Sequence, residues 1–436
     1  MTEIRAFKGF RYAAEFGSDV SALIAPPYDI ISPAQQQALY KRNPHNVIRL
    51  EFGVEQPSDT KLNNRYTRSA ADFAEWRSDL LLKQETAPAL YVYRQTFKQG
   101  TKSLQRVSLI AQTRLEPWDA KVILPHEKTL PKAKNDRLQL LRACAANFSP
   151  IMALYDDSDK AIAMNLNAIT ELHPDSTATD DEKTFHELWV VTNADIVTRL
   201  SAHFRNKQLF IADGHHRYET ALEYREEVRA KRLGLPPNDA ANFVMMSLIS
   251  TEDAGLVILP THRLISGLSE KVLAQFLKKL PNYLTLTELP ADCTPTALTQ
   301  KLQKAAAANV PAMAAVTADA VYLAVPNSAG QEFLRKNFSL PAMQSLDAAA
   351  AQAIILGDSL GLTADDIAAG GLVTYTHSAA DALKATRSGQ VQLAVILSGA
   401  RPQQLRDIAA AGELMPQKST YFYPKLITGM VINPLW

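Results

Sequence analysis

One short stretch constrains this 436-residue chain more than any other. An apolar run from Leu209 to Ala212 stops at Asp213-Gly214, and a helical pattern begins at once. Asp-Gly is a turn signal, so the pattern predicts a strand, a tight turn and a helix. The first N–H groups of such a helix lack partners within the helix, and with the helix dipole they favour an anion, often a phosphate. The sequence therefore predicts a phosphate or nucleotide site at this turn.

Four polar side chains surround the turn: Asp213, His215, His216 and Arg217. Arg217 can offer a bidentate fork to a phosphate, and the two histidines can contact phosphate oxygens. Asp213 is the expected magnesium ligand. Two histidines with an Asp also suggest a transition-metal site, but consecutive helix positions point apart, so both binding one ion is disfavoured. The structural alternative is a polar turn with a capping Asp, although a turn needs none of these four side chains together.

Other candidate groups lie far along the chain from this turn. His126-Glu127 stands in a polar loop between two prolines, where a glutamate is usually only solvated. Lys418-Ser419-Thr420 stands where a loop meets a strand, so it either binds a phosphate or carboxylate or simply opens the strand. Asp29, after Pro26-Pro27-Tyr28, is either a site residue or a helix cap.

The composition excludes several classes of protein. The net charge is +1, from 46 basic and 45 acidic side chains, which gives no support for binding to nucleic acid or to an acidic membrane. Two distant cysteines, no signal-peptide core and no apolar stretch of roughly 20 residues favour the cytoplasm. The sequence lacks the P-loop, Rossmann, CxxC, GxSxG and HExxH motifs, so it gives no support for the common kinases, dehydrogenases and zincins.

The hydrophobic pattern predicts a mixture of helices and strands. Helices are expected at 66–82, 135–146, 216–232, 305–320, 347–353 and 402–411. Strands are expected at 46–52, 89–93, 107–111 and 391–397, and another opens within 415–425. Residues 174–183 are expected to form a solvated loop.

Gly214-His215-His216-Arg217, after an apolar strand, resembles the phosphate-binding box of the ParB/sulfiredoxin superfamily. His215 stands where sulfiredoxins need a cysteine, and the near-zero net charge does not suit a ParB protein. The free serine kinases of this superfamily carry Pro-His-Glu, then Asp-Gly-His-His-Arg, then Pro-Lys-Thr-Thr-Arg. Here Pro125-His126-Glu127, Asp213–Arg217 and Pro416–Thr420 follow in the same order.

Taken as a whole, from Ala25-Pro26-Pro27-Tyr28-Asp29 to the Lys418–Lys425 end, the chain resembles the family called domain of unknown function 1015. The resemblance implies an α+β fold with a ParB/sulfiredoxin-like nucleotide-binding core at 116–260. An N-terminal α/β extension of unknown role would occupy 1–115, and a C-terminal α/β domain at 261–436 would close the cleft.

The resemblance implies a nucleotide-dependent phosphotransferase: a serine-kinase-like enzyme that phosphorylates the hydroxyl of a small, amino-acid-like molecule, with ATP or ADP as donor and Mg²⁺. No nucleic acid or membrane partner is expected. Glu127 would be the general base, joined in catalysis by Asp213 and His216. Phosphate binding is assigned to Gly214, His215, His216 and Arg217, and substrate binding to Lys418, Ser419 and Thr420. Tyr421 replaces the arginine that follows Thr-Thr in the serine kinases.

Two other functions stay open at this point. The first is a nucleotide-binding regulatory switch without turnover, for which CTP is also a candidate ligand. The second is a metal-dependent phosphohydrolase or nuclease that uses His215 and His216 around a metal.

Overall fold

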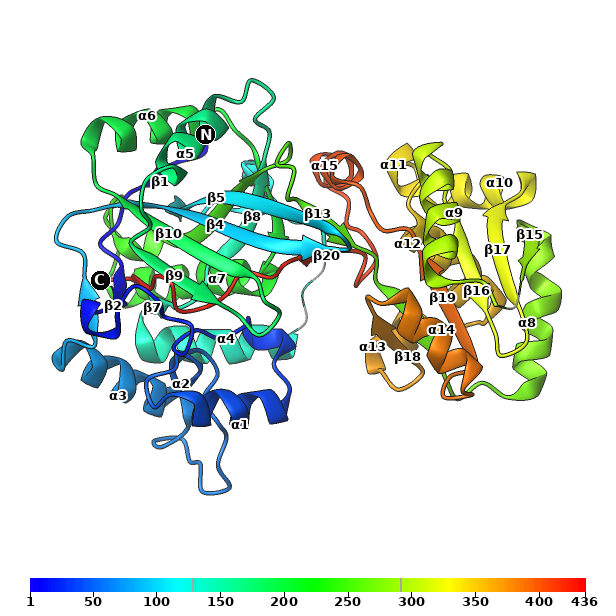
Figure 1. The fold of residues 1–436 in the computed structure, drawn as a ribbon, viewed down its shortest axis with the longest axis horizontal. Helices are drawn as coiled ribbons and strands as arrows, with labels where there is room; N and C mark the ends of the chain where they lie inside the picture. The colour runs from blue at the N-terminus through cyan, green and yellow to red at the C-terminus, as the bar shows by residue number, and fades with distance from the viewer. Residues whose placement is uncertain (128, 130, 291) are drawn as a thin grey trace. The chain divides into compact units, whose positions relative to one another are not determined.

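The computed structural model describes residues 1–127, 129, 131–290 and 292–436 (Figure 1). It is a mixed α/β protein, with 38% helix and 25% strand. The chain forms two compact units. Unit 1 combines residues 1–125, 129–257 and 424–436, and unit 2 combines His126 and Glu127 with residues 258–423. In the part of the chain that is described, no helix is long and apolar enough to cross a membrane.

The main sheet of unit 1 has nine strands among the described residues, with β1 paired to β5 and the others in the order β6-β11-β8-β12-β5-β4-β10-β9. Their bounds are β1 Ile4–Arg5, β4 Leu90–Gln99, β5 Lys102–Arg114, β6 Ile123–Leu124, β8 Ile151–Tyr155, β9 Ser176–Thr179, β10 Phe185–Val191, β11 Leu209–Asp213 and β12 Phe243–Ser250. Every residue of β8 and β12 is buried, as in central strands covered on both faces. Strands from 1–115 and from 116–260 therefore share one sheet.

Helices lie on both sides of this sheet. Figure 1 shows α5 (Ala161–Thr170) and α6 (Ala194–Phe204) on one side, and α1 to α4 on the other. These four are α1 Pro33–Arg42, α2 Ile48–Glu51, α3 Arg65–Ser78 and α4 Pro131–Cys144. Helix α7 (His215–Lys231) packs on α4, β8 and β12. Two short pairs complete the unit: β2 (Phe10–Tyr12) with β3 (Leu82–Gln84), and β7 (Ala146–Asn147) with β21 (Asn433–Pro434).

Two expectations for unit 1 are wrong. Residues 46–52 contain the short helix α2 instead of a strand, and the Asn46 side chain accepts the N–H of Ile48 at its start. Val47, Ile48 and Leu50 are all fully buried, so the apolar spacing reflects burial on every side. Within the expected loop at 174–183, residues 176–179 form β9 and pair with β10.

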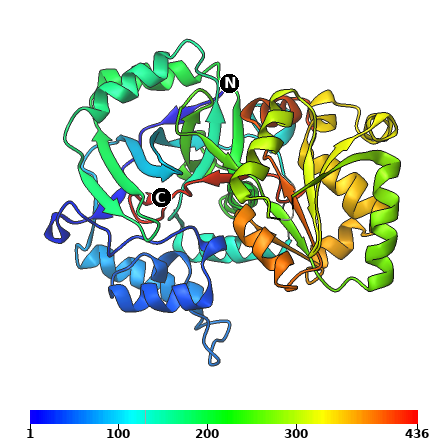
Figure 2. The ribbon, with the colours of Figure 1, turned by 45° about the vertical axis from the view of Figure 1, so that its right-hand side comes forward.

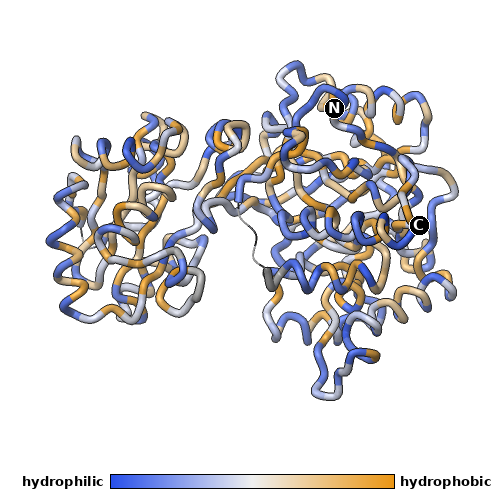
Figure 3. Tube along the Cα trace, turned by 180° about the vertical axis from the view of Figure 1, so that it is seen from behind, coloured by the Kyte–Doolittle hydropathy of each residue, from blue (hydrophilic) through white to orange (hydrophobic). Residues whose placement is uncertain are grey.

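Unit 2 is built on a six-stranded sheet in the described residues, in the order β15-β17-β16-β19-β14-β18. Its strands are β14 His262–Ile265, β15 Leu284–Leu289, β16 Met313–Val316, β17 Val321–Pro326, β18 Val373–Thr376 and β19 Leu393–Leu397. Strand β13 (Val257–Leu259) leads into the unit and β20 (Tyr421–Tyr423) ends it. Figure 2 shows helices flanking these strands, and Figure 3 shows hydrophobic stretches within this unit.

The helices of unit 2 are α8 Glu270–Tyr283, α9 Pro295–Ala307, α10 Ser328–Asn337, α11 Pro341–Gln344, α12 Asp347–Ala350, a π-helix at Ala351–Ser359, α13 Ala364–Ala369, α14 Ala379–Arg387 and α15 Pro402–Ala410. The predicted helix at 305–320 is wrong beyond Ala307. Asn309 takes a left-handed conformation and Pro311 follows, so the helix ends and the buried run Met313–Val316 joins the sheet. The expected helix at 347–353 is confirmed.

Candidate functional site

The predicted strand, turn and helix around Asp213 are confirmed in unit 1. Strand β11 ends at Asp213, Gly214 has φ +97°, and α7 starts at His215. A Cβ atom on residue 214 would lie 2.8 Å from Nη2 and 2.9 Å from Nε of Arg217. Only glycine combines this backbone conformation with so close an approach to the guanidinium. The turn therefore holds Arg217 against the backbone at the start of the helix.

Asp213 is bound by two cations. Its Oδ2 atom lies 3.0 Å from Nη2 of Arg217, and its Oδ1 atom lies 2.5 Å from Nζ of Lys425. Burial raises the pKa of Asp213, but the charges of Lys425 and Arg217 outweigh it and hold the pKa well below its usual range. Asp213 is therefore ionised, and each carboxylate oxygen faces a cation.

Arg217 is held on its other side by a buried relay. Its Nη1 donates to the Ser149 hydroxyl at 3.1 Å and to the Pro150 carbonyl at 2.6 Å. The Ser149 hydroxyl in turn donates to Oε1 of Glu51 at 2.9 Å, and Arg137 donates to the same oxygen at 3.2 Å. Burial raises the pKa of Glu51, and the charges of Arg137 and Arg217 counteract that rise. Glu51, Arg137, Ser149 and Arg217 all line a cavity of about 40 Å³.

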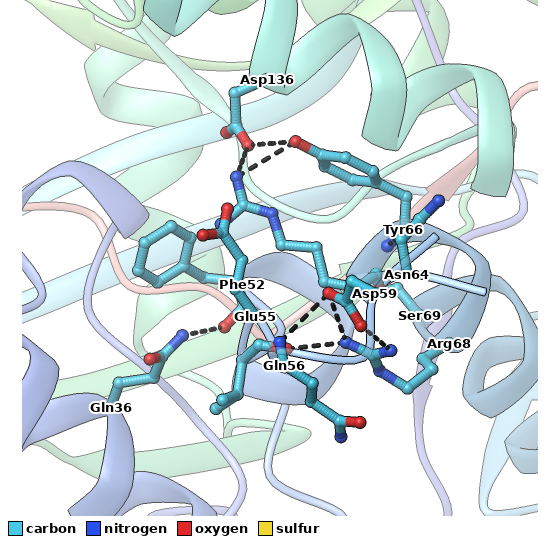
Figure 4. A network of polar contacts seen from close by, with 12 residues as sticks. Gln36, Phe52, Glu55, Gln56, Asp59, Asn64, Tyr66, Arg68, Ser69 and Asp136 are labelled. Atoms are coloured by element: carbon cyan, nitrogen blue, oxygen red, sulfur yellow. Dashed lines mark hydrogen bonds and ion pairs between the residues drawn. The ribbon is translucent and has the colours of Figure 1, made fainter. Parts of the chain in front are cut away.

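The relay is anchored to helix α3 through Asp136. Arg137 donates to Asp136 at 2.7 Å, and its guanidinium lies 3.8 Å from the centre of the Tyr28 ring. The Tyr66 hydroxyl donates to Asp136 at 2.8 Å, as Figure 4 shows. The N-terminal 115 residues therefore supply Glu51, Tyr28 and Tyr66 to the surroundings of Arg217, in a region whose role the sequence left unknown.

Lys425 is fixed through its own backbone. Gln95 donates to the Lys425 carbonyl at 2.9 Å, and Arg106 donates to the Pro424 carbonyl. Both side chains are buried, and burial lowers the pKa of Arg106 to about 10. Two adjacent strands, β4 and β5, thus hold the C-terminal segment that carries the second cation on Asp213.

The site does not fit the expected magnesium ion. Mg²⁺ needs carboxylate oxygens that are free to coordinate it, and both oxygens of Asp213 already face Arg217 and Lys425. Among the described residues, no three His, Cys, Asp or Glu side chains are grouped so that they can hold a metal ion. The structure therefore gives Asp213 another task, which is to hold two cations in place.

The two histidines occupy the first turn of α7. The His215 side chain is buried, with 8% of its surface exposed, and His216 is half-buried. The Thr220 hydroxyl donates to the His216 carbonyl at 2.6 Å, one turn further along the helix. Both histidines thus stand at the helix start, beside the Arg217 that Asp213 holds.

Unit 2 brings the other predicted residues together. The Glu127 carboxylate accepts the backbone N–H of Lys418 at 3.2 Å, from a residue 291 positions away. Lys418 has a left-handed backbone, with φ +58°. Ring atom Nε2 of His126 lies 2.9 Å from the Thr420 hydroxyl, and the Ser419 hydroxyl donates to the Pro416 carbonyl at 2.6 Å. Glu127 and the 418–420 segment thus form one cluster, while Asp213 to Arg217 belong to unit 1.

Thr261-His262-Arg263, which the sequence analysis did not single out, adds buried polar groups to unit 2. His262 Nδ1 accepts the N–H of Leu397 at 3.2 Å, and burial, then the charges of His377 and Arg263, lower the pKa of His262 to about 4. The Arg263 side chain is 1% exposed, and burial lowers its pKa against the charges of Tyr375, Asp347 and Glu127. The available signal was three consecutive polar residues directly before the apolar Leu264-Ile265.

Comparison with known proteins assigns the chain to a family. The sequence profile described as "Protein of unknown function (DUF1015)" matches residues 4–349. The chain belongs to this family. No curated protein matches it in sequence.

Solved structures give only remote matches to this DUF1015 protein. A free serine kinase in complex with AMP aligns at a TM-score of 0.37 and 12% identity, over 75% of this chain and 91% of that one. A conserved hypothetical protein from Pyrococcus furiosus aligns at 0.34 and 14%, over 76% and 97%. SbnI with a C-terminal truncation, from Staphylococcus aureus, aligns at 0.33 and 10%, over 75% and 87%. Similarity this low assigns no activity, so the function has to be argued from the residues.

Proposed function

We propose that this DUF1015 protein is a small-molecule O-kinase, which transfers a phosphoryl group from ATP or ADP to a hydroxyl group. One observation carries the proposal: Arg217 and Lys425 are held side by side on Asp213 at the start of helix α7. Phosphoryl transfer depends mainly on positioning and on neutralising charge, and two fixed cations at a helix start supply both. As part of the same proposal, residues 116–260 correspond to a ParB/sulfiredoxin-like core.

The phosphate-binding part of the mechanism belongs to unit 1. Arg217 and Lys425 attract the phosphate oxygens, and the backbone N–H groups of the first turn of α7 add donors. His215 and His216, in the same helical turn, give further contacts to the nucleotide phosphates. Because Asp213 holds both cations before any ligand arrives, little reorganisation is needed when charge develops during transfer.

The acceptor part of the mechanism belongs to unit 2. Glu127 is fixed by the N–H of Lys418, and it takes the proton of the acceptor hydroxyl. The hydroxyl oxygen then forms a bond to the terminal phosphorus of the nucleotide. The bond from that phosphorus to the bridging oxygen breaks, and the shortened nucleotide leaves with the electron pair. Lys418, Ser419 and Thr420 are assigned to the acceptor, although the Ser419 hydroxyl also closes its own turn.

The cellular setting proposed for this reaction is the cytoplasm, where nucleotides are abundant. Cys144 and Cys293 are both buried and unbonded to each other, which suits a reducing compartment.

Substitution of Glu127 tests the proposal. Glu127→Gln keeps the side-chain shape and the acceptor for Lys418 but removes the base. We expect transfer to fall at least 100-fold, the contribution typical of a general base, while nucleotide affinity changes less than threefold. Chromatography of the nucleotide products measures transfer, and titration calorimetry measures binding.

The matched control is Glu270→Gln, an exposed glutamate in the first turn of α8 in the same unit. It is expected to retain full transfer. If Glu127→Gln turns over like the control, Glu127 is not the base. If neither wild-type nor control transfers phosphate but both bind nucleotide, the protein is a nucleotide-dependent switch.

A further inference from the structure

One guanidinium nitrogen of the buried Arg263 has no hydrogen-bond partner among the residues that the structure describes. Arg263 lies in β14, between Tyr375 of β18 and Val395 of β19. Its Nη1 donates to the Thr261 carbonyl, yet its buried Nη2 finds no hydrogen-bond partner in the described part of the chain. A buried unpaired donor on a charged group is costly, and native proteins seldom keep one without a reason.

Thr261, two positions earlier, also carries a polar group that lacks a hydrogen bond in the described part of the chain. Its side chain is 1% exposed, and its hydroxyl also lacks a partner among the described residues. Positions i and i+2 of an extended segment face the same side, and the bond from Arg263 to the Thr261 carbonyl brings the guanidinium back to that residue. The two unpaired groups therefore belong to one small polar spot with a charged donor and a hydroxyl.

Two carboxylates act on Arg263 from elsewhere in unit 2, those of Asp347 and Glu127. Asp347 is already bound, because its Oδ2 accepts the Ser398 N–H at 2.6 Å and the Gly399 N–H at 3.1 Å. Glu127 is held by the Lys418 N–H alone among its described hydrogen bonds. The Arg263 guanidinium is thus subject to the charge of the residue proposed as base.

The position that carries an arginine in the serine kinases is Tyr421 here, so it cannot supply a guanidinium to a ligand. The Tyr421 ring stacks on His377 with 3.7 Å between ring centres. Three other arginines of unit 2 have described hydrogen bonds elsewhere: Arg387 donates to the Cys293 carbonyl, Arg401 to Asn309 and Arg406 to Gln403. The Glu127 charge acts on Arg263.

We propose that Arg263 and Thr261 bind the carboxylate of the acceptor, so that the acceptors are small hydroxy acids. The inference rests on the proposed kinase function, because it places the acid group of the same molecule whose hydroxyl Glu127 deprotonates. A carboxylate accepts from a guanidinium N–H and a hydroxyl at once. The nearby charges of Glu127 and Asp347 disfavour a dianionic phosphate, and the burial of both donors excludes a large ligand.

The test compares acceptors that differ only in the acid group. L-serine and D-glycerate carry a hydroxyl and a carboxylate, whereas ethanolamine keeps the hydroxyl and amine of serine without the acid. Calorimetric titration of the full chain is expected to show binding of serine or glycerate, and at least 100-fold weaker binding of ethanolamine. Equal affinity for ethanolamine would overturn the inference, as would inorganic phosphate binding at this site in place of the acids.

Variants locate the binding to these residues. Arg263→Met is expected to weaken acid binding at least 100-fold and Thr261→Val about 10-fold, with ADP affinity unchanged. Arg387→Met, which removes an arginine of the same unit that binds a backbone carbonyl, is expected to bind the acid normally. If Arg263→Met does not fold, Thr261→Val and the wild-type acceptor series decide. Unchanged acid binding in Thr261→Val and a folded Arg263→Met would contradict the assignment.

The two proposals fail in different ways. Acid binding that depends on Arg263, without phosphate transfer to any acceptor, would refute the kinase and keep the carboxylate site. Transfer to ethanolamine as fast as to serine would keep the kinase and refute the carboxylate site.

Discussion

The two polar clusters of this protein differ in how completely their polar groups are paired. In unit 1, each oxygen of Asp213 faces a cation, and Arg217 bonds to three different acceptors. In unit 2, Arg263 and Thr261 each leave a buried group without a partner among the described residues. In the first cluster both Asp213 oxygens and both terminal nitrogens of Arg217 are paired, while the Nε atom of Arg217 lacks a partner among the described residues. In the second cluster a terminal guanidinium nitrogen and a hydroxyl lack the partners that a ligand can supply. This difference fits a rigid phosphate site and an acceptor site that selects its ligand by pairing these groups.

The comparison is tested most strongly by substitution of Glu51, whose carboxylate accepts hydrogen bonds from Ser149 and Arg137 in the first cluster. Glu51→Ala leaves Arg137 buried with one fewer counter-charge, so we expect unfolding in urea to become easier by about 3 kcal/mol. Because Ser149 then loses its anchor, ADP affinity should also fall, by about 10-fold in calorimetry.

Glu187→Ala is the matched control. Glu187 pairs with Arg94 across β10 and β4, in the same sheet but outside the cluster. It should cost about 1–3 kcal/mol of stability and leave ADP affinity unchanged. An equal loss of affinity in both variants would mean that Glu51 acts through stability alone.

Gly214 tests the close contact between the turn and Arg217. Gly214→Ala places a Cβ 2.8 Å from the guanidinium at φ +97°, so a cost of about 2 kcal/mol in thermal unfolding and weaker ADP binding are expected. Gly234→Ala, just beyond the other end of α7, has a positive φ but no atom within 4 Å of its Cβ. It should cost about 1 kcal/mol and leave ADP binding intact. Identical behaviour of the two variants would show that the contact with Arg217 is unimportant.

The pH dependence of stability separates the second cluster from the first. The pKa of folded His262 is about 4, below the ordinary value of about 6.5, so the unfolded chain binds more protons between these pH values. Stability from neutral His262 is present above about pH 6.5 and is lost towards pH 4, by up to about 1.4 kcal/mol per pH unit. His262→Asn, which keeps an acceptor for Leu397, should flatten this slope in urea titrations. An unchanged slope would show that His262 does not cause the pH dependence of stability.

The smallest expected effect is at Ser149. Ser149→Ala removes its bonds to Glu51 and Arg217 and should cost about 1 kcal/mol, with roughly threefold weaker ADP binding. Ser247→Ala is its control, because Ser247 is also buried and bonds to Ser108 in the core of the same unit. It should cost similar stability and nothing in affinity. A loss of ADP affinity in the control would make the serine effect non-specific.

The sequence predicted what is local and missed what depends on distant partners. The strand, turn and helix at Asp213 are set by residues next to one another, and the family resemblance is confirmed. Lys425 reaches Asp213 from 212 positions away, and Ser149 reaches Glu51 from 98, so no local spacing shows these contacts. Glu51 was further hidden because its segment alternates like a strand, although it forms a buried helical turn.

The same limit explains Arg263 and Asp213. In the sequence, Arg263 belongs to no predicted element, and only the fold shows that it is buried with a nitrogen that has no partner among the described residues. Asp213 suggested a magnesium ligand because its residue type suits one, whereas in the structure its two carboxylate oxygens face Arg217 and Lys425. Residue types and order thus indicate the chemistry, while pairing decides which group performs it.

The most direct test of the central claim is a phosphorus-31 NMR survey of the full chain in magnesium-containing buffer. ATP, ADP and CTP would each be offered with serine, glycerate, homoserine and ethanolamine, beside the Glu127→Gln variant. The account predicts a new phosphomonoester signal from ATP or ADP with a hydroxy acid, absent with the variant. No phosphomonoester from any pair, with a nucleotide that still raises the melting temperature, would contradict the kinase and identify a nucleotide-binding switch.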